Sequence, residues 1–483
     1  MPSNRVVRVR SADEGVAAQS LRSGIRHIQD ELGVSPRFPD EVERAAARAA
    51  DRPRMPDLDR TDIPFVTIDP PGSLDLDQAL HLERDGDGYV VHYAIADVAA
   101  FVTPGDPVDV EAHRRGETLY GADSRVALHP PVLSEDAASL LPDQVRPALL
   151  WTLRVDAAGE CTGVSVERAR VRSTARLDYE GAQRLIDEGN ADGSLALLAE
   201  VGPLRLAREA ARGGVSLPLP EQEVDVTDDV WRLEYRTLLP VEEWNAQLSL
   251  LTGFGAASLM VQARVGLLRT LPTPDPRDVQ RLHRTARALG LDWPAEQDYP
   301  EFIRSLDPGK PLHAAMVTAC TRLLRGSGYV GFDGEVPAAP RHAALAAEYA
   351  HVTAPLRRLG DRYAGEICVS LCAGEPVPTW VLEELDLLPG LLQDSGRRAH
   401  QYEAAVLDLV EAGVLKDRVG QLFEGVVVDV AEKDGTRGVV TVQDPAIEAP
   451  VTSPAPLPLG EQVSVRLAEA DVANRRVAFT LGG

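Results

Sequence analysis

The sequence predicts a mixed α+β fold in three parts, and three changes of pattern along the chain indicate it. Strand-like runs separated by Gly and Pro dominate residues 64–155, helical patterns dominate residues 177–414, and the remaining C-terminal residues return to short β-type runs. A chain of 483 residues is long enough for about three domains. We expect a mostly helical N-terminal region over residues 1–60, a mixed domain of strands and many helices over residues 61–416, and a small β-barrel over residues 417–483.

The first two parts contain recognisable helices and strands. In the N-terminal region, which is rich in Ala and Arg, a helix is expected to open near Pro39 and to cover residues 41–50. The β-branched and aromatic residues of Phe65–Ile68 predict a buried strand, and Tyr89–Asp97 predicts another. The apolar stretch Gln247–Ala263 predicts a helix, because it is too long for a single strand.

The C-terminal part has the spacing of a small barrel. Phe423–Val430, Gly438–Val442, Glu461–Leu467 and Arg475–Leu481 are short β-type runs separated by Gly, Pro and Asp. This pattern resembles a short S1-type OB barrel. A small β-domain that serves only for packing is the alternative, and the scarcity of aromatic residues weakens the stacking platform expected of a nucleic-acid barrel.

Charge and composition restrict the possible classes of partner. The net charge is −24, and a strongly acidic chain is a poor general binder of nucleic acid unless its cations are concentrated in a channel. Lys occurs only three times, so nearly all positive charge is Arg, which suits phosphate recognition although genomic base composition explains the bias equally well. The four Cys lack disulfide or metal-ligand spacing and are expected to be reduced packing residues. No membrane segment or secretory leader is visible, so we expect a cytoplasmic protein.

A cluster of carboxylates follows the strand Phe65–Ile68. Asp69, Asp75 and Asp77 lie within nine residues, and the intervening Pro-Pro-Gly forces a turn that lets the chain fold back. Oxygen ligands suit a hard cation such as Mg²⁺, and the absence of neighbouring Cys or His argues against zinc. An acidic surface turn is the alternative interpretation.

A second segment, Tyr349–Asp361, is typical of an anion-binding helix start. Thr353 and Pro355 indicate the first turn, so Arg357 and Arg358 are expected to lie within it. Backbone N–H groups and guanidinium groups would together favour a phosphate at that position. In the alternative interpretation the Arg pair forms salt bridges with nearby acids such as Asp361.

Together the two segments suggest metal-assisted phosphoryl transfer. The chain resembles the ribonuclease II and ribonuclease R family, which is built around the RNB catalytic domain. Asp69–Gln78 resembles the aspartate signature of the family, and His351–Asp361 resembles its Thr-Ser-Pro-Ile-Arg-Arg helix start, within a resemblance that extends in order over Phe65–Asp408. This resemblance implies Mg²⁺-dependent hydrolysis of single-stranded RNA from its 3′ end to nucleoside 5′-monophosphates, with no essential protein partner.

The resemblance also implies roles for single residues. Asp69, Asp75 and Asp77 would coordinate Mg²⁺ and act in catalysis with Arg357, which would contact the reacting phosphate. Gln78 occupies the position of a fourth metal ligand, where the family usually has a carboxylate.

Three further residues are implied to bind RNA. Tyr120 would stack on the terminal base, and its alternative is a half-buried core Tyr. Arg358 would meet the phosphate backbone, and Glu403 resembles a glutamate near the bound RNA end.

Several departures from the family pattern qualify the expected activity. Gln78 carries no charge, the Ser of the second motif is Ala354, and a second base-clamping aromatic is replaced by Leu217. The first sixty or so residues are too few for the paired cold-shock barrels of the family. An active 3′ to 5′ exoribonuclease is the favoured hypothesis, and a catalytically weak RNA-binding or regulatory protein is the second. A metal phosphohydrolase acting on small phosphoesters is the third.

Overall fold

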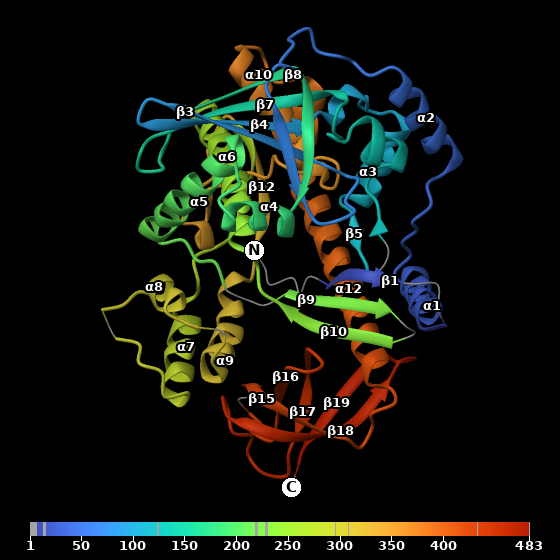
Figure 1. The fold of residues 1–483 in the computed structure, drawn as a ribbon, viewed down its shortest axis with the longest axis vertical. Coiled ribbons are helices and arrows are strands. Elements are labelled where there is room, and N and C mark those ends of the chain that lie inside the picture. The colour runs from blue at the N-terminus through green and yellow to red at the C-terminus, as the bar shows by residue number, and fades with distance from the viewer. Residues whose placement is uncertain are drawn as a thin grey trace.

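Two closed five-stranded barrels lie at opposite ends of the molecule, and a long helix runs between them (Figure 1). The computed structural model describes most of the chain, namely residues 7–12, 16–122, 125–217, 221–227, 230–294, 296–307, 309–431 and 433–482. Helices and strands are mixed along these residues, so the predicted α+β class is confirmed.

The first barrel contains the strand that ends in the aspartate segment. Its strands are β2 (Phe65–Asp69), β3 (Gln78–Asp85), β4 (Gly88–Ala96), β7 (Val145–Val155) and β8 (Cys161–Asp178). They follow the order β2-β3-β4-β7-β8 with antiparallel neighbours, and a parallel pairing of β2 with β8 closes the barrel. Large side chains fill this part of the core. Tyr93 and Trp151, for example, are a cross-strand pair and both are fully buried.

Helices cover this barrel and pack on its core. They are α3 (Pro107–Arg115), α4 (Tyr179–Asp187), α5 (Gly193–Arg212), α6 (Pro240–Ala263), α10 (Leu359–Ala373) and α11 (Thr379–Glu384). The central one, α6, contains the predicted helix over residues 247–263 and packs against α5, α10 and β8. Its apolar residues point in many directions, as expected of a helix buried on several sides.

The N-terminal region contains helices, as expected, and also a strand that its composition did not indicate. Besides α1 (Val16–Glu31) and α2 (Asp40–Asp51), it contains the strand β1 (Val7–Ala12). This strand pairs in parallel with β9 (Glu221–Thr227), which pairs with β10 (Val230–Arg236). A strand whose partner is more than 200 residues away carries little local signal, so the mostly helical expectation missed it.

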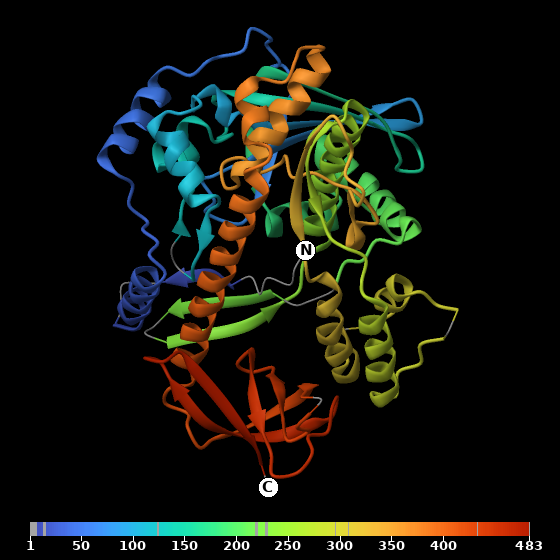
Figure 2. The same cartoon turned by 180° about the vertical axis from the view of Figure 1, so that it is seen from behind.

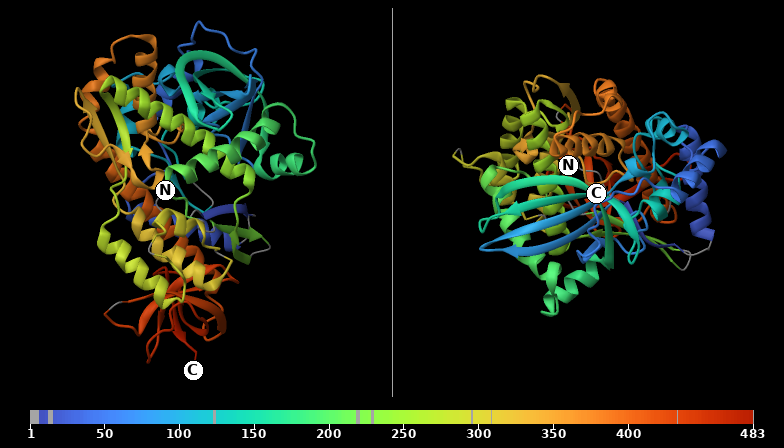
Figure 3. Two further views of the ribbon diagram at one scale, coloured as in Figure 1. Left: turned by 90° about the vertical axis from the view of Figure 1, so that its left-hand side faces the viewer. Right: turned by 90° about the horizontal axis from the view of Figure 1, so that it is seen from above.

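A helical wing and three short sheets complete the middle of the molecule. The wing comprises α7 (Pro276–Ala288), α8 (Tyr299–Arg304), α9 (Pro311–Cys320) and the 3₁₀ turn η3 (Thr321–Leu324), and in it Trp293 stacks between His283 and Phe302. The sheets pair β11 (Val265–Thr270) with β12 (Gly328–Asp333), β13 (Arg341–His342) with β14 (Ala347–Glu348), and β5 (Leu119–Tyr120) with β6 (Arg125–Val126). Figure 3 shows the wing beside the C-terminal barrel.

The predicted C-terminal barrel is confirmed. Its strands are β15 (Leu422–Val430), β16 (Arg437–Val442), β17 (Ile447–Thr452), β18 (Gln462–Asp471) and β19 (Arg476–Leu481). They close in the order β15-β16-β17-β19-β18, with β17 and β19 parallel. The sequence pattern missed β17, because Pro450 lies within it and Pro normally counts against a strand.

The helix α12 (Leu388–Leu415) connects the two barrels and contacts α1, β5, β10 and β12 along its length (Figure 2). Its 28 residues make it the longest described helix. No helix in the described part of the chain is both long enough and apolar enough to span a membrane. All four Cys are free thiols.

The close packing of α12 on β10 can be tested by substitution of two glycines in α12. A Cβ atom at Gly413 would lie 2.1 Å from the ring of Trp231, whereas one at Gly390 in the same helix would meet nothing within 4 Å. Gly413→Ala should therefore lower the free energy of unfolding by about 1–3 kcal/mol through overpacking. Gly390→Ala should raise it by about 0.5–1 kcal/mol, since Ala is the better helix former. Urea denaturation measures both, and equal effects at the two positions would contradict this packing.

Candidate active site

The aspartate segment turns back at the end of β2. Asp69 is the last residue of β2, and β3 begins again at Gln78, so the loop between them carries Asp75 and Asp77. The backbone holds this return in place, because Leu76 N–H donates to Ser139 Oγ at 3.0 Å and Asp77 C=O accepts from Ala96 N–H at 2.9 Å. Asp77 is 5% exposed, while Asp69 and Asp75 are half-buried.

The arginine segment lies against this return. Helix α10 begins at Leu359, so Arg357 and Arg358 precede the helix, and the expectation that both lie in its first turn is wrong. The reason is a backbone pairing: Thr118 N–H donates to Arg357 C=O at 2.9 Å, and Glu117 forms a β-bridge with Arg358. This pairing keeps Arg358 extended, with φ −136° and ψ 121°, until the helix begins.

Asp77 joins the two segments directly. Its Oδ1 accepts a hydrogen bond from Leu356 N–H at 2.8 Å, and its Oδ2 lies 3.4 Å from Arg357 Nε. The side chain of Arg357 is 40% exposed, more than that of Asp77. The Asp77 carboxylate thus binds the backbone of Leu356, which lies 279 positions later in the chain.

Arg358 is engaged differently from Arg357. Its Nε and a terminal nitrogen donate to the two carboxylate oxygens of Asp361 at 3.0 and 2.7 Å. Asp361 also accepts from Ala354 N–H at 2.8 Å and is fully buried. The salt-bridge alternative therefore holds for Arg358, whereas Arg357 faces the aspartates. The RNA-binding role of Arg358 stays a prediction, and two of its donor groups are already used.

Asp75 has a partner that sequence reasoning missed. Arg125 donates to Asp75 Oδ1 at 2.6 Å and lies 2.6 Å from Glu135 Oε1. A single Arg among the many in this chain carries no signal of such a role. By contrast, no hydrogen bond or ion pair to the carboxylate of Asp69 is present among the described residues.

Tyr120 lies at the edge of the same group. In the β5–β6 hairpin it pairs with Arg125, the residue that holds Asp75. Its side chain is 38% exposed, while burial at its hydroxyl end raises the pKa of the phenol to about 12. Arg357 opposes this shift and Asp75 and Asp77 add to it, so the hydroxyl lies within electrostatic reach of all three. An accessible aromatic face beside the carboxylates fits the stacking role proposed for it from the sequence.

Burial and mutual repulsion disfavour the charged forms of Asp69 and Asp77. Burial raises the pKa of Asp77 to about 8, with Asp75 adding to the shift and Arg357 opposing it. Burial also raises the pKa of Asp69 to about 6, again with Asp75 adding to the shift. Repulsion by Asp75 at both neighbours shows that the three groups share one environment.

The carboxylate oxygens of this segment suit a hard divalent cation. The side chains are not, however, arranged to bind one as they stand. Carboxylate oxygens are the ligands such cations prefer, and a cation would relieve the repulsion around Asp75. Within the described ranges, however, no three His, Cys, Asp or Glu side chains are gathered closely enough to hold a metal ion as they stand. Asp75 faces Arg125 and Asp77 faces Arg357, so ligation by all three would require Asp75 to change partner.

The amide oxygen of Gln78 and one of its N–H groups are bound to other protein groups. Its Nε2 donates to Thr353 C=O at 2.7 Å, and its Oε1 accepts from the hydroxyls of Ser249, at 3.0 Å, and Tyr93. Both lone pairs of the amide oxygen are thereby used. The predicted ligand role of Gln78 thus competes with an existing hydrogen-bond network.

Glu403 lies on α12, within electrostatic reach of Glu117. Burial raises the pKa of its carboxyl to about 7, and Glu117 adds to the shift. Glu117 in turn accepts from Ser395 Oγ at 3.1 Å and pairs with the backbone of Arg358. The predicted residues therefore form one group around Asp77 and a second, acidic pair beside α12, and nothing in the sequence pattern pointed to Glu117.

Leu217 packs away from solvent. It is half-buried and contacts the apolar clusters of the helical wing and of Leu271, Leu324 and Ala344. Its side chain thus has a packing role. Leu217 therefore does not supply a stacking partner for the second face of a base bound at Tyr120.

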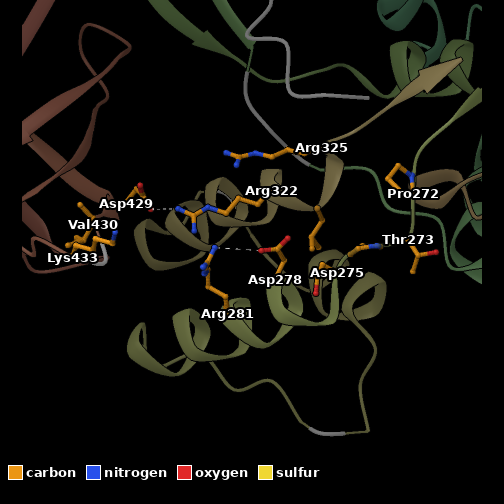
Figure 4. Close-up of a pocket in the computed structure, with 13 residues that line it drawn as sticks. Pro272, Thr273, Asp275, Asp278, Arg281, Arg322, Arg325, Asp429, Val430 and Lys433 are labelled. Atoms are coloured by element: carbon orange, nitrogen blue, oxygen red, sulfur yellow. Dashed lines mark hydrogen bonds and ion pairs between the residues drawn. The ribbon is translucent and has the colours of Figure 1, made fainter. Parts of the chain in front are cut away.

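A cavity of about 660 Å³ lies elsewhere, between the helical wing and the β15–β16 turn (Figure 4). Arg322 pairs with Asp429 across it at 3.1 Å, and Arg281 pairs with Asp278 at 3.6 Å. None of the eight predicted site residues is among the described residues that line it. Two of its four lining cations, Arg281 and Arg322, are paired with acids, and the cavity contains none of the carboxylates of the aspartate segment, so the candidate chemistry stays at Asp77.

Comparison with known proteins shows which family the chain resembles. The RNB domain matches residues 58–370, and the RNase II-type exonuclease C-terminal S1 domain matches residues 421–482. Ribonuclease R of Escherichia coli is 28% identical over 402 residues, which are 77% of this chain and 48% of that protein. An uncharacterized ribonuclease of Synechocystis is 24% identical over 453 residues, or 92% of this chain and 63% of that protein. The chain spans about half the length of the Escherichia coli relative.

Solved structures share the fold. RNase R of Mycoplasma genitalium, in complex with ribose methylated single-stranded RNA, superimposes with a TM-score of 0.84 at 19% identity, over 96% of this chain and 78% of that one. Yeast Ssd1, described as a pseudonuclease, superimposes with a TM-score of 0.70 at 16% identity, over 92% of this chain and 57% of that one. Since the RNB match alone covers more than half of the residues, the chain belongs to the RNB family of ribonucleases, homologous to ribonuclease R and ribonuclease II.

Proposed function

We propose that this protein is a 3′ to 5′ exoribonuclease that hydrolyses single-stranded RNA to nucleoside 5′-monophosphates and requires Mg²⁺. The observation that carries the proposal is the meeting of Asp77 with Leu356 N–H and Arg357 in a chain of the RNB family. The partly exposed guanidinium, two further carboxylates and an exposed aromatic ring lie within electrostatic reach of this point. These are the groups that hydrolysis of a phosphodiester at a strand end needs.

Each residue in the group has a physical role. A divalent cation held by Asp69, Asp75 and Asp77 would polarise the scissile phosphate and lower the pKa of the attacking water. Arg357 would contact the reacting phosphate and stabilise the charge that develops on its oxygens, because its guanidinium is anchored by Asp77 beside the carboxylates and its side chain is partly exposed. Tyr120 would stack on the terminal base and set its position.

A catalytically weak RNA-binding protein is the second candidate. The specific observation in its favour is Gln78, whose amide is consumed by protein hydrogen bonds and which supplies no charge to the carboxylate group. The structural likeness to Ssd1 shows that this fold also occurs in a protein described as a pseudonuclease.

Incubation with a 5′-labelled poly(A) strand and Mg²⁺ separates these candidates. The proposed function predicts progressive shortening from the 3′ end with release of AMP, and loss of this shortening in the Asp77→Asn variant by about 10²-fold or more. Asp87→Asn, at an exposed position in the β3–β4 turn, is the matched control and should retain full activity. Retention of intact strand by the wild type under all metal conditions would favour the binding protein.

Substitution of Arg357 tests its assignment to the transition state. Arg357→Ala should lower kcat by about 10²–10³-fold while changing KM for RNA by much less, since the charge that it stabilises develops during reaction. Steady-state kinetics on the labelled strand measure the two constants. Arg154→Ala, which removes an exposed Arg paired with Asp85, should leave both unchanged. Equal losses in kcat and in affinity at Arg357 would contradict the assignment.

Glu403 has a pH-dependent effect on stability. Its folded-state pKa of about 7 is above its usual value of 4.5, so its contribution to folding is most favourable in acid and is lost as the pH rises through 7. Glu403→Gln removes this loss. The free energy of unfolding of the variant relative to wild type should therefore rise between pH 5 and pH 8 by on the order of 1 kcal/mol. Urea denaturation at both pH values measures it, and a pH-independent difference would count against the shift.

A further inference from the structure

Gln78 connects four separate parts of the site. It is the first residue of β3, directly after Asp77. Its amide oxygen accepts from Tyr93 of β4 and from Ser249 of α6, and the two hydroxyls also lie 2.9 Å apart. Its amide nitrogen donates to Thr353 C=O at 2.7 Å, across 275 residues of sequence. Tyr93 is fully buried and Thr353 is 3% exposed, whereas Gln78 and Ser249 are half-buried.

The orientation of the amide is determined by its neighbours. A carbonyl oxygen such as that of Thr353 can only accept, so the amide nitrogen must face it. The opposite orientation would place two acceptors 2.7 Å apart in a largely buried position. The oxygen must therefore face the two hydroxyls, which supply one donor for each of its lone pairs.

The contact at Thr353 holds the turn that carries Arg357. Three side chains bind the backbone of this turn in succession: Gln78 at Thr353 C=O, Asp361 at Ala354 N–H and Asp77 at Leu356 N–H. The turn then closes on itself, since Arg357 N–H donates to Ala354 C=O at 3.2 Å. Gln78 and Asp77 are adjacent in sequence, so one rigid strand end fixes the turn at two points. The position of the Arg357 guanidinium depends on both.

We propose that Gln78 is a positioning residue that sets the place of Arg357 through the Thr353 carbonyl, and that it is not a metal ligand. The inference rests on the proposed function, because it assigns a role within the same site. It replaces the interpretation of Gln78 as an uncharged stand-in for a fourth metal ligand. A carboxylate there would lose the donor to Thr353 and set a negative charge against its carbonyl oxygen, which would displace the turn.

The test compares two isosteric substitutions in the full-length protein. Gln78→Glu changes the amide to a carboxylate of the same length. Gln222→Glu is the matched control, because Gln222 is also buried and its Nε2 also donates to a remote backbone carbonyl at 2.7 Å, that of Ala446 in the C-terminal barrel. Both variants should melt at lower temperature than wild type, so stability alone does not distinguish a positioning role from a structural one.

Kinetics on the labelled RNA strand distinguish the two roles. Gln78→Glu should lower kcat by about tenfold or more, with KM for RNA and the Mg²⁺ concentration at half-maximal rate changed by less than about threefold, because Arg357 is displaced while the metal ligands remain. Gln222→Glu should leave kcat unchanged. A rise in kcat, or a lower half-saturating Mg²⁺ concentration, in Gln78→Glu would show that position 78 does ligate the metal and would overturn the proposal.

Hydrogen exchange tests the positioning independently of catalysis. In metal-free buffer, Gln78→Glu should accelerate amide exchange at least about fivefold in peptides that cover residues 353–358, whereas Gln222→Glu should not. If the wild type fails to degrade RNA and this acceleration is observed, the proposed function fails and the positioning role stands. If exchange in residues 353–358 is the same in Gln78→Glu as in wild type, the positioning role is rejected whatever the activity.

Discussion

The contact of Asp77 with Leu356 N–H and Arg357 is the constraint on which the rest of the site depends. It brings the end of the first barrel against the turn that precedes α10, and it does so with a nearly fully buried carboxylate. A buried carboxyl group without partners is strongly unfavourable, so the hydrogen bond and the ion pair of Asp77 hold the two segments together. Tyr120, Arg125 and Gln78 take their places around this junction.

The electrostatics of the site follow from the burial of several carboxyl groups close to one another. Burial, and then repulsion by Asp75, raise the pKa of both Asp69 and Asp77, and Arg357 opposes only part of each shift. Functional sites commonly contain such unrelieved charge, because it becomes favourable when a cationic ligand binds. Next to these carboxylates, the uncharged amide of Gln78 binds the backbone at Thr353, in the turn that precedes Arg357.

Elements set by local sequence patterns could be predicted, whereas elements that depend on pairing with distant segments could not. The strand before Asp69, the helix around residues 247–263 and the C-terminal barrel were predictable, since their patterns of apolar residues and turns are contained in short windows. The start of α10 was not, because the pairing of Arg358 with Glu117 comes from a segment more than 200 residues earlier. Strand β1 escaped prediction for the same reason, and β17 because of an internal Pro.

The sequence by itself determined the chemistry that is available: three carboxylates after a strand, an arginine pair after a Pro, and an S1-like barrel at the end. Only the tertiary structure decided how these groups are used. It assigned Arg357 to Asp77 and Arg358 to Asp361, gave Asp75 to Arg125, and turned the amide of Gln78 toward Thr353 and two hydroxyls. The physical reason is that donor and acceptor type are properties of a residue, whereas partnership depends on which distant backbone and side-chain groups the folded core brings within hydrogen-bond distance.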